Sequence, residues 1–504
     1  MKACLALSLS LTFCLLSNNA AASVSLEEKL NQQWQNYQKA RALLLDRAKD
    51  PNQPIEDRLI SRSNWEAVIA LQGDYALTPS DIDSLLVSQR ARIRSARAAA
   101  LKRSPIDLNE VRARQEVSAF CAQIPKGGML HIHPGGTVDR STAEELLTSR
   151  NPVLPIQEIV QDVTTKPGMM LYPNELSWLK SLGRDENFLS LTKGDQAVYE
   201  SFLFLPRGKQ PFERFQSVFD FVRAAENDHQ DEKTILNNFA RRAMKQGVIY
   251  VEFTTGFDEE MLEILSEVEA ETGLTIRLNK AFSRTKTPAE LDKDLQPFLA
   301  TSQDPRVLGV DFIANESGNP ALEKGQMLYG SVLQAVLTGK TRLHRTMHAG
   351  ETGDTRDPRD AMILGAERLG HGVTLASDPV ALEYAARIHE PIEINLSSNL
   401  RLTSVKTVAE HPFLDYLRLG LPVSLSTDDE GIFDTDIDQE CELAVSQTDI
   451  SYAELKEMAF NSIETSFASD DDKKALRDKL ARSFMVFEKG FRAKATDHSE
   501  LISR

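Results

Sequence analysis

The stretch LHRTMHAGETGDTRDPRDAMILGAERLGHGVT, residues 343–374, shows the strand–helix–strand pattern from which the fold class can be predicted. A short apolar run at Leu343–His348 is followed by a longer connection and by a second short run at Leu369–Thr374. Short runs of this kind, bounded by glycine and polar residues, are typical of buried strands. Two such strands joined by a helical connection predict one unit of a parallel sheet.

The same pattern continues on both sides of this stretch. Most of the predicted strands are separated by roughly 20–35 residues, which is the spacing of alternating strands and helices in a closed parallel barrel. We therefore predict an α/β fold of the (β/α)8 TIM type, with an N-terminal helical extension and a long helical insertion after strand 1. The eight predicted strands are Gly128–His133, Val248–Thr254, Thr275–Phe282, Val307–Ile313, Leu343–His348, Leu369–Thr374, Ile392–Leu396 and Val423–Thr427.

The insertion, residues 134–247, must hold several helices because it is far longer than the other connections. Within it, Pro211–Asn227 carries an apolar stripe at helical spacing, which predicts a helix packed on a core. A second interpretation makes this stripe a wall of the active-site mouth. The stripe consists of Phe212, Phe215, Phe219 and Val222.

The first 22 residues have the pattern of a secretory signal peptide. Lys2 is followed by an apolar run at residues 4–16 and by the small residues Ala20–Ala22. The run is shorter than the roughly 20 residues that a membrane-spanning helix needs. We therefore expect residues 1–22 to be removed, and the mature chain to be periplasmic or extracellular, without a membrane partner.

We divide the remaining chain into an N-terminal helical region, residues 23–115, and a barrel, residues 116–504. Leu26–Arg47 and Asp81–Arg103 are rich in good helix formers at helical spacing. The basic stretch Arg90–Arg103 has two interpretations, an anion-binding helix or a face that is solvated or paired within the chain. The acidity of the whole chain favours the second.

Composition narrows the range of partners. The 504 residues include 58 Lys+Arg and 74 Asp+Glu, a net charge of −16, which argues against nucleic acid as a partner. Of the four cysteines, the predicted mature chain keeps Cys121 and Cys441. These either form a disulfide or remain two buried thiols. The oligomeric state, including a homodimer, is left open.

Histidines and carboxylates gather at or near the predicted strands, mostly at their carboxyl ends, where barrel enzymes hold their active sites. Each cluster alone also has a structural interpretation, such as a turn residue or a helix cap. Together, three imidazoles and a carboxylate suit a zinc ion that keeps one position for water, and a further glutamate suits proton transfer. The residues concerned are His131, His133, His348, Glu351, His371, Asp428 and Asp429.

In chain order, these segments resemble the adenosine deaminase family of the metal-dependent amidohydrolase superfamily. The resemblance runs from Pro125 to about Phe433. The lead-in PKGG, the signal peptide and the N-terminal extension are most similar to the secreted, growth-factor-related branch. The segments are PKGGMLHIH (125–133), GVIYVEF (247–253), VLGVDFIANE (307–316), TMHAGET (346–352), RLGHGV (368–373), EINLSSN (393–399) and SLSTDDEGIF (424–433).

The resemblance implies a role for each matched residue. One Zn²⁺ would be bound by His131, His133, His348 and Asp428. Glu351 would deliver a proton to purine N1, and Asp429 would hydrogen-bond purine N7. His371 would orient the attacking water and help to deprotonate it. The implied reaction is hydrolytic deamination of adenosine or a related adenine nucleoside to the inosine-type product and ammonia.

Three departures from the family pattern concern the substrate more than the reaction. Gly135 stands where many members have an acidic residue that contacts the ribose 5′-hydroxyl. Ala314 replaces a glycine whose backbone N–H would contact purine N3. Asn395-Leu396 replace the usual Cys-Pro. The substrate's sugar is therefore left open.

Two alternatives compete with this interpretation. The first is another amidohydrolase, acting on a different purine or on an amide. Binuclear members usually bridge their metals with a lysine on strand four, and residues 313–316 offer none, which favours one metal. The second is a non-catalytic extracellular binding or signalling protein. Deaminases of the cytidine type are excluded because their ligand motif is missing.

Overall fold

A computed structural model describes residues 24–502, except 51–52, 167, 227, 257, 302–303 and 353. The predicted signal peptide lies outside the described residues. Among the described residues, no helix combines the length and apolar character needed to cross a bilayer.

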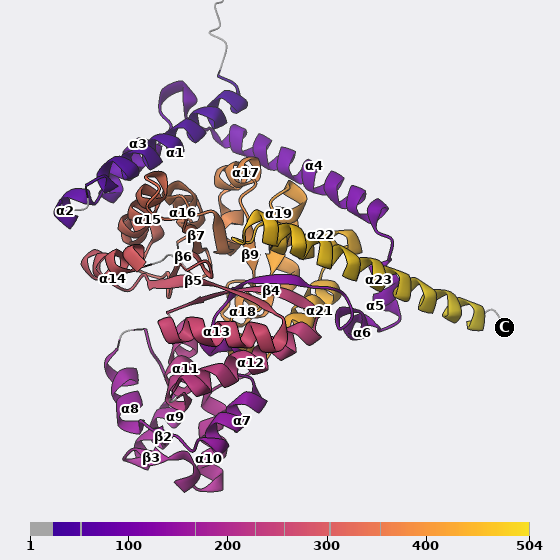
Figure 1. The fold of residues 1–504 in the computed structure, drawn as a ribbon. Coiled ribbons are helices and arrows are strands. Elements are labelled where there is room, and N and C mark those ends of the chain that lie inside the picture. The colour runs from indigo at the N-terminus through magenta and orange to yellow at the C-terminus, as the bar shows by residue number, and fades with distance from the viewer. Residues whose placement is uncertain are drawn as a thin grey trace, which may run out of the picture.

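Eight parallel strands form the centre of the fold, in the order β1-β4-β5-β6-β7-β8-β9-β10 (Figure 1). The edge strands β1 and β10 meet beyond their ends, where the Asp428 N–H donates to His131 O at 3.2 Å and the His133 N–H donates to Asp428 O at 3.3 Å. These contacts close the barrel, and the predicted (β/α)8 fold is confirmed. The strands are β1 (Gly127–Ile132), β4 (Val248–Thr255), β5 (Thr275–Ser283), β6 (Val307–Ile313), β7 (His344–Ala349), β8 (Arg368–His371), β9 (Ile392–Ile394) and β10 (Val423–Leu425).

Three strands, β8, β9 and β10, end two or more residues earlier than predicted, and β10 stops at Leu425 instead of Thr427. For β8 and β9 the backbone explains the early end. β8 stops at His371 because His371 and Gly372 have φ of 63° and 61°, in the left-handed region that cannot continue a strand. β9 stops at Ile394 because a short helix, α18 (Leu396–Arg401), begins two residues later. Both early endings place side chains near the mouth of the barrel.

Helices connect the strands on the outside of the barrel (Figure 1). Their inward faces join the strands in one large apolar core, with the exception of the short helix α20, whose Ile432 and Phe433 pack in the core of the insertion. These helices are α12 (His229–Lys245), α13 (Glu259–Thr272), α14 (Pro288–Thr301), α15 (Ala321–Leu337), α16 (Asp357–Leu364), α17 (Pro379–Ile388), α19 (Phe413–Leu419), α20 (Glu430–Phe433), α21 (Ile437–Gln447), α22 (Tyr452–Glu464) and α23 (Asp470–Ile502).

The insertion after β1 forms its own layer, on the side of the barrel away from the N-terminal helices (Figure 1). It holds several helices, as predicted, and packs around a second apolar core. Its elements are α7 (Arg140–Ser149), α8 (Ile156–Thr165), α9 (Pro173–Leu182), α10 (Lys193–Phe202), α11 (Phe212–Ala225) and the antiparallel pair β2 (Val153–Leu154) and β3 (Glu186–Asn187).

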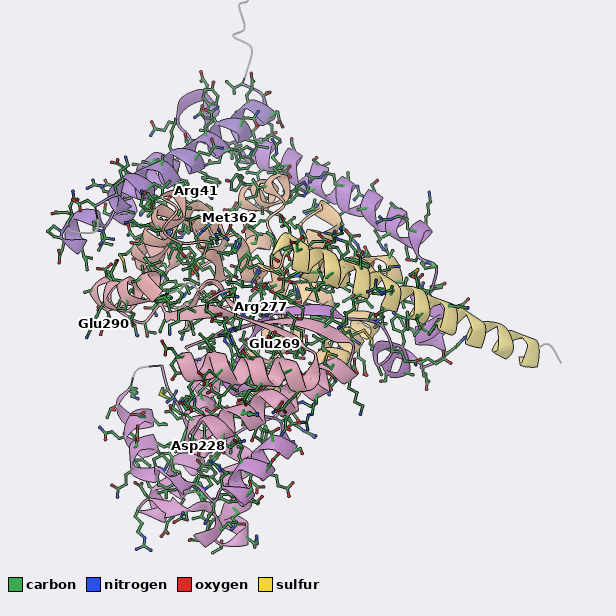
Figure 2. The ribbon with its side chains drawn as sticks, in the orientation of Figure 1. Arg41, Asp228, Glu269, Arg277, Glu290 and Met362 are labelled. Carbon is green, nitrogen blue, oxygen red and sulfur yellow. A yellow bond between two sulfur atoms is a disulfide. The ribbon has the colours of Figure 1, made fainter. Side chains whose placement is uncertain are left out.

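The N-terminal helices pack against the outside of the barrel. Arg41 donates to the carbonyls of Met362 and Ile363 in α16. Arg41 and Met362 are labelled in Figure 2. Arg92 forms an ion pair with Glu383 at 2.8 Å, so the basic stretch is at least partly paired within the chain. The helices are α1 (Leu26–Ala48), α2 (Ile55–Arg58), α3 (Arg62–Ile69), α4 (Pro79–Arg103), α5 (Leu108–Ala113) and α6 (Val117–Cys121).

A disulfide joins Cys121 of α6 to Cys441 of α21, with a Cα–Cα distance of 5.7 Å. Of the two alternatives left open by the sequence, the structure contains the disulfide. It ties the segment just before β1 to a helix that follows β10, so it links the two ends of the barrel across 320 residues.

Candidate metal centre and active site

Four predicted ligands converge at the carboxyl end of the barrel. His131, His133, His348 and Asp428 each offer one ligand atom, and all four atoms lie within 4.8 Å of one another. Asp428 Oδ1 lies 3.6 Å from His131 Nε2 and 3.4 Å from His133 Nε2. Residues far apart in the chain therefore meet because the barrel brings the ends of β1, β7 and β10 together.

Each histidine is oriented by a hydrogen bond at Nδ1, which turns Nε2 toward the centre. His131 Nδ1 lies 2.8 Å from Glu393 Oε2, and His348 Nδ1 lies 3.1 Å from Asp311 Oδ1. His133 Nδ1 donates to the backbone carbonyl of Thr254 at 3.0 Å. Partners of this kind fix the tautomer and orientation of metal-ligating imidazoles.

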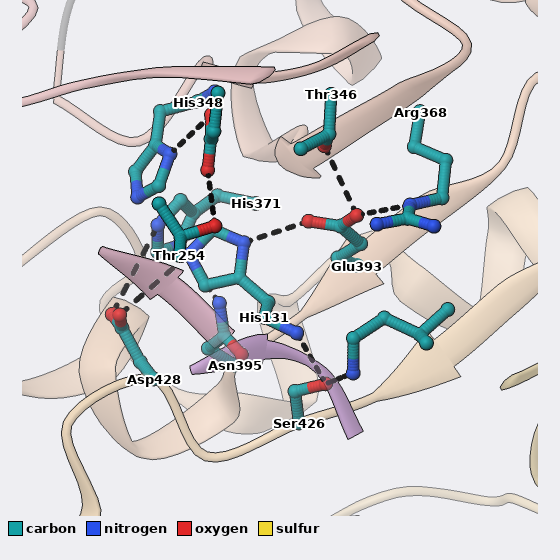
Figure 3. Close-up of polar contacts among 12 residues, drawn as sticks. His131, Thr254, Thr346, His348, Arg368, His371, Glu393, Asn395, Ser426 and Asp428 are labelled. Carbon is teal, nitrogen blue, oxygen red and sulfur yellow. Dashed lines mark hydrogen bonds and ion pairs between the residues drawn. The ribbon is translucent and has the colours of Figure 1, made fainter. Parts of the chain in front are cut away.

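Glu393 is itself held in place by buried partners (Figure 3). Thr346 Oγ1 donates to its Oε1 at 3.0 Å, and the guanidinium of Arg368 pairs with the same oxygen. Arg368 also pairs with Glu252 at 2.6 Å. Because Arg368 lowers the pKa of Glu393 despite its burial, this carboxylate stays charged beside His131.

The four residues fit a divalent cation. Among the described residues, nothing hydrogen-bonds to His131 Nε2, although the atom is buried and faces the cluster. Burial alone would lower the pKa of His133, but Asp429, Asp428 and Asp311 together raise it to about 10, so the cluster attracts positive charge. Three imidazole nitrogens and one carboxylate oxygen are a donor set that zinc accepts.

Glu351 and His371 lie beside these ligands. His371 Nε2 lies 3.8 Å from Glu351 Oε2 and 3.9 Å from Asp428 Oδ2. Burial, and then the charge of Asp428, raise the pKa of Glu351 well above its ordinary value, so the carboxyl group favours its protonated form. Glu316 accepts from the N–H groups of Gly350 and Thr352, at 3.1 Å each, and so holds the loop that carries Glu351.

Several backbone positions around the site are strained or crowded. His371, Asp428 and Ala314 have φ of 63°, 61° and 81°, a region that favours glycine. This explains the family glycine at position 314, where alanine keeps the unusual backbone. At Gly370, an added Cβ would lie 2.7 Å from His131 Cε1, so the ligand packs directly on the glycine.

A cavity of about 700 Å³ opens in front of these residues. Its inner end is lined by His133, His348, Glu351, His371, Asp428 and Asp429, and Ala314 also borders it. Its outer wall includes Phe212, Phe215, Phe219 and Val222 of α11. The apolar stripe therefore has both predicted roles. Phe215 and Val222 are buried in the core of the insertion, and all four residues form part of the cavity wall.

Gly135 also borders the cavity, and no described atom lies within 4 Å of the position that a Cβ would take there. The acidic contact common in the family is therefore absent at this position, and the space for it stays open. Charged side chains of the insertion border the cavity instead, among them Lys166, Asp220, Arg223 and Glu226.

The residues that orient the histidines of the candidate active site carry no clear signal in the sequence. Asp311 and Glu393 lie within strands and look like ordinary strand carboxylates. Asn399 Nδ2 lies 2.9 Å from His371 Nδ1, and His411 Nε2 lies 3.0 Å from Asn399 Oδ1. Asp311, Glu393 and Asn399 all lie within segments that resemble the family, but the contact of Asn399 depends on the placement of α18. His411 lies outside those segments, so no sequence signal pointed to it.

A closed parallel barrel with a histidine–aspartate cluster at its carboxyl end is the architecture of metal-dependent barrel hydrolases. The model of the adenosine deaminase family matches residues 177–483. The adenosine deaminase of Photorhabdus laumondii is 31% identical over 227 residues, which are 45% of this chain and 66% of that enzyme. The adenosine deaminase of Salmonella schwarzengrund is 32% identical over 254 residues, 47% of this chain and 74% of that enzyme.

The chain therefore belongs to the adenosine deaminase family. Membership of this family confirms the predicted enzyme class, a hydrolytic aminohydrolase. A solved amidohydrolase of Burkholderia ambifaria, described with bound Zn, shares the fold with a TM-score of 0.55 at 19% identity. That match covers 75% of this chain and 94% of the other.

Proposed function

We propose that this chain catalyses the hydrolytic deamination of adenosine or a related adenine nucleoside, releasing ammonia, with one zinc ion bound by His131, His133, His348 and Asp428. The observation that carries the proposal is the cluster of these four residues with Glu351, His371 and Asp429 at the inner end of one cavity. Zinc bound there would supply a Lewis acid that makes water nucleophilic at neutral pH.

The protonation states of the carboxyl groups suit the purine ring. Purine N1 and N7 are hydrogen-bond acceptors, so the groups that meet them must carry protons. Burial, and then the charge of Asp428, raise the pKa of Asp429 well above its ordinary value, as they do for Glu351. Glu351 would transfer its proton to N1 as water adds to C6, and Asp429 would donate to N7. His371, between Glu351 and Asp428, would hold the attacking water.

We expect the Asp429→Ala enzyme to lose about 10–100-fold in kcat/KM, because a buried purine contact disappears. Asp429→Asn keeps an N–H donor toward N7, so its loss should stay below about tenfold. Steady-state kinetics with adenosine would measure both. Equal losses in the two variants would mean that Asp429 does not act as a hydrogen-bond donor to N7.

A panel of adenine compounds tests the substrate. Purified zinc-loaded protein would be incubated with adenosine, 2′-deoxyadenosine, adenine, AMP and N6-methyladenosine, while ammonia or methylamine is measured. Adenosine or deoxyadenosine should give the highest kcat/KM. Release from none of these compounds would reject the proposed function, and preference for adenine or AMP would correct the substrate.

We also propose that the mature chain begins near Ser23 and is exported. The signal-peptide pattern and the Cys121–Cys441 disulfide support this, because disulfides persist in oxidising compartments. N-terminal sequencing of protein from periplasmic or extracellular fractions should find a start near Ser23. Cytosolic protein that keeps Met1, with Cys121 and Cys441 as free thiols, would contradict export.

A further inference from the structure

A chain of hydrogen bonds runs from a backbone N–H to His371. The Phe413 N–H donates to His411 Nδ1 at 3.2 Å, and His411 Nε2 lies 3.0 Å from Asn399 Oδ1. Asn399 Nδ2 lies 2.9 Å from His371 Nδ1. All three side chains are buried, with His371 and Asn399 at 0% exposure and His411 at 5%.

The direction of every bond in this chain follows from its first member. A backbone N–H can only donate, so His411 Nδ1 accepts, and the proton of the neutral ring sits on Nε2. Burial lowers the pKa of His411 to about 3, which keeps the ring neutral at physiological pH. Asn399 must then turn its oxygen toward His411 and its NH₂ group toward His371. His371 Nδ1 accepts, and its proton sits on Nε2.

The neighbouring elements hold this arrangement in place. Asn395 Nδ2 lies 3.4 Å from the same His371 Nδ1, so a second amide donor also faces that atom. Glu440 of α21 accepts from the N–H groups of Leu396 and Ser397 at 2.8 and 3.2 Å, and so fixes the start of α18, which carries Asn399. Among the described residues, nothing hydrogen-bonds to His371 Nε2, which borders the cavity.

We infer that His411 is a positioning residue, which acts through Asn399 to hold His371 as the tautomer that carries its proton on Nε2. In this form His371 donates a hydrogen bond to the oxygen that adds to the substrate, and its neutral ring cannot accept a proton at Nε2. The base that deprotonates the water is then another group, so His371 keeps the orienting role that the family resemblance implies but not the role in deprotonation. The consequence for turnover rests on the proposed function, whereas the tautomer itself does not.

The experiment compares four proteins labelled with ¹⁵N in histidine: the parent, His411→Leu, His411→Gln and Asn399→Asp. Long-range ¹H–¹⁵N spectra report the tautomer of His371 in zinc-loaded and metal-free protein, and a His371→Gln sample identifies its signals. Leucine removes the donor to Asn399, whereas glutamine retains one. The isosteric aspartate replaces the amide donor beside His371 with an acceptor.

The parent should show His371 protonated on Nε2 alone. His411→Leu should mix the tautomers and lower kcat by about tenfold or more, with KM within about twofold and zinc content unchanged, because one fixing hydrogen bond is lost. His411→Gln should restore both the tautomer and most of kcat. Asn399→Asp should place a proton on Nδ1 of His371 and lower kcat further. If His411→Leu does not fold, the Asn399→Asp protein tests the inference in its place.

A parent enzyme with His371 protonated on Nδ1 would overturn the inference. So would a His411→Leu protein with an unchanged tautomer and kcat, or a loss of kcat that His411→Gln does not relieve. If no adenine compound is deaminated, the proposed function fails, but the spectra of the parent and of Asn399→Asp still decide whether the hydrogen bonds set the tautomer.

Discussion

Glu351→Gln should lower kcat for adenosine by about 10²–10⁴-fold, the contribution typical of general acid–base catalysis. Glutamine has the same shape and keeps hydrogen-bonding capacity, but its amide protons are not acidic enough to be transferred to the purine ring. Glu351 is not one of the four clustered ligands, so zinc content and affinity for a non-reacting purine nucleoside should change little. Steady-state kinetics, metal analysis and calorimetric binding would measure the three quantities.

Glu316→Gln is the matched control, because Glu316 is the buried glutamate that holds the loop of Glu351. Its amide oxygen can still accept from the two backbone N–H groups, so kcat should fall by less than about tenfold. If Glu351→Gln deaminates adenosine at nearly the parent rate with full zinc, another group donates the proton. Glu316 would then be the first candidate, and its own variant would show the large loss.

His348→Ala should abolish both zinc retention and activity. The substitution removes one of four ligands and also leaves the buried Asp311 without its imidazole partner. Thermal stability should fall as well, because a ligand that binds the folded state at about 1,000 times its Kd stabilises it by ~4 kcal/mol. Elemental analysis after gel filtration and thermal melts with and without added zinc would measure both effects.

His344→Ala is a control on the same strand, because His344 begins β7 and is half-exposed at the opposite end of the barrel from the candidate active site. This variant should keep one zinc per chain and parent-like turnover. A His348→Ala protein that keeps full zinc and activity would contradict the proposed ligand set. Two zinc ions in the parent would favour the binuclear alternative.

The strands and the candidate ligands could be predicted because each depends on a local pattern. Short apolar runs mark strands that are buried on both faces, as in β1, where all six residues are buried. His131 and His133 are two residues apart at the end of such a run, so they face the same side. The positions where β8 and β9 end were less predictable, because they depend on a left-handed backbone and on a short helix.

The residues that support the candidate active site could not be predicted, because their partners are set by tertiary packing. His131 and Glu393 are 262 residues apart in sequence, and Cys121 and Cys441 are 320 apart. No spacing rule connects such pairs. The bond between Asn399 and His371 depends on the position of α18, which a strand pattern does not specify.

The most direct test of the central claim is ammonia release from adenosine by metal-free protein and by the same protein reloaded with zinc. We expect ammonia and inosine in equal amounts after one zinc per chain has been restored, and almost none from the metal-free sample. Protein that binds one zinc per chain yet releases no ammonia from adenosine or its close analogues would contradict the claim, as would equal turnover by the metal-free sample.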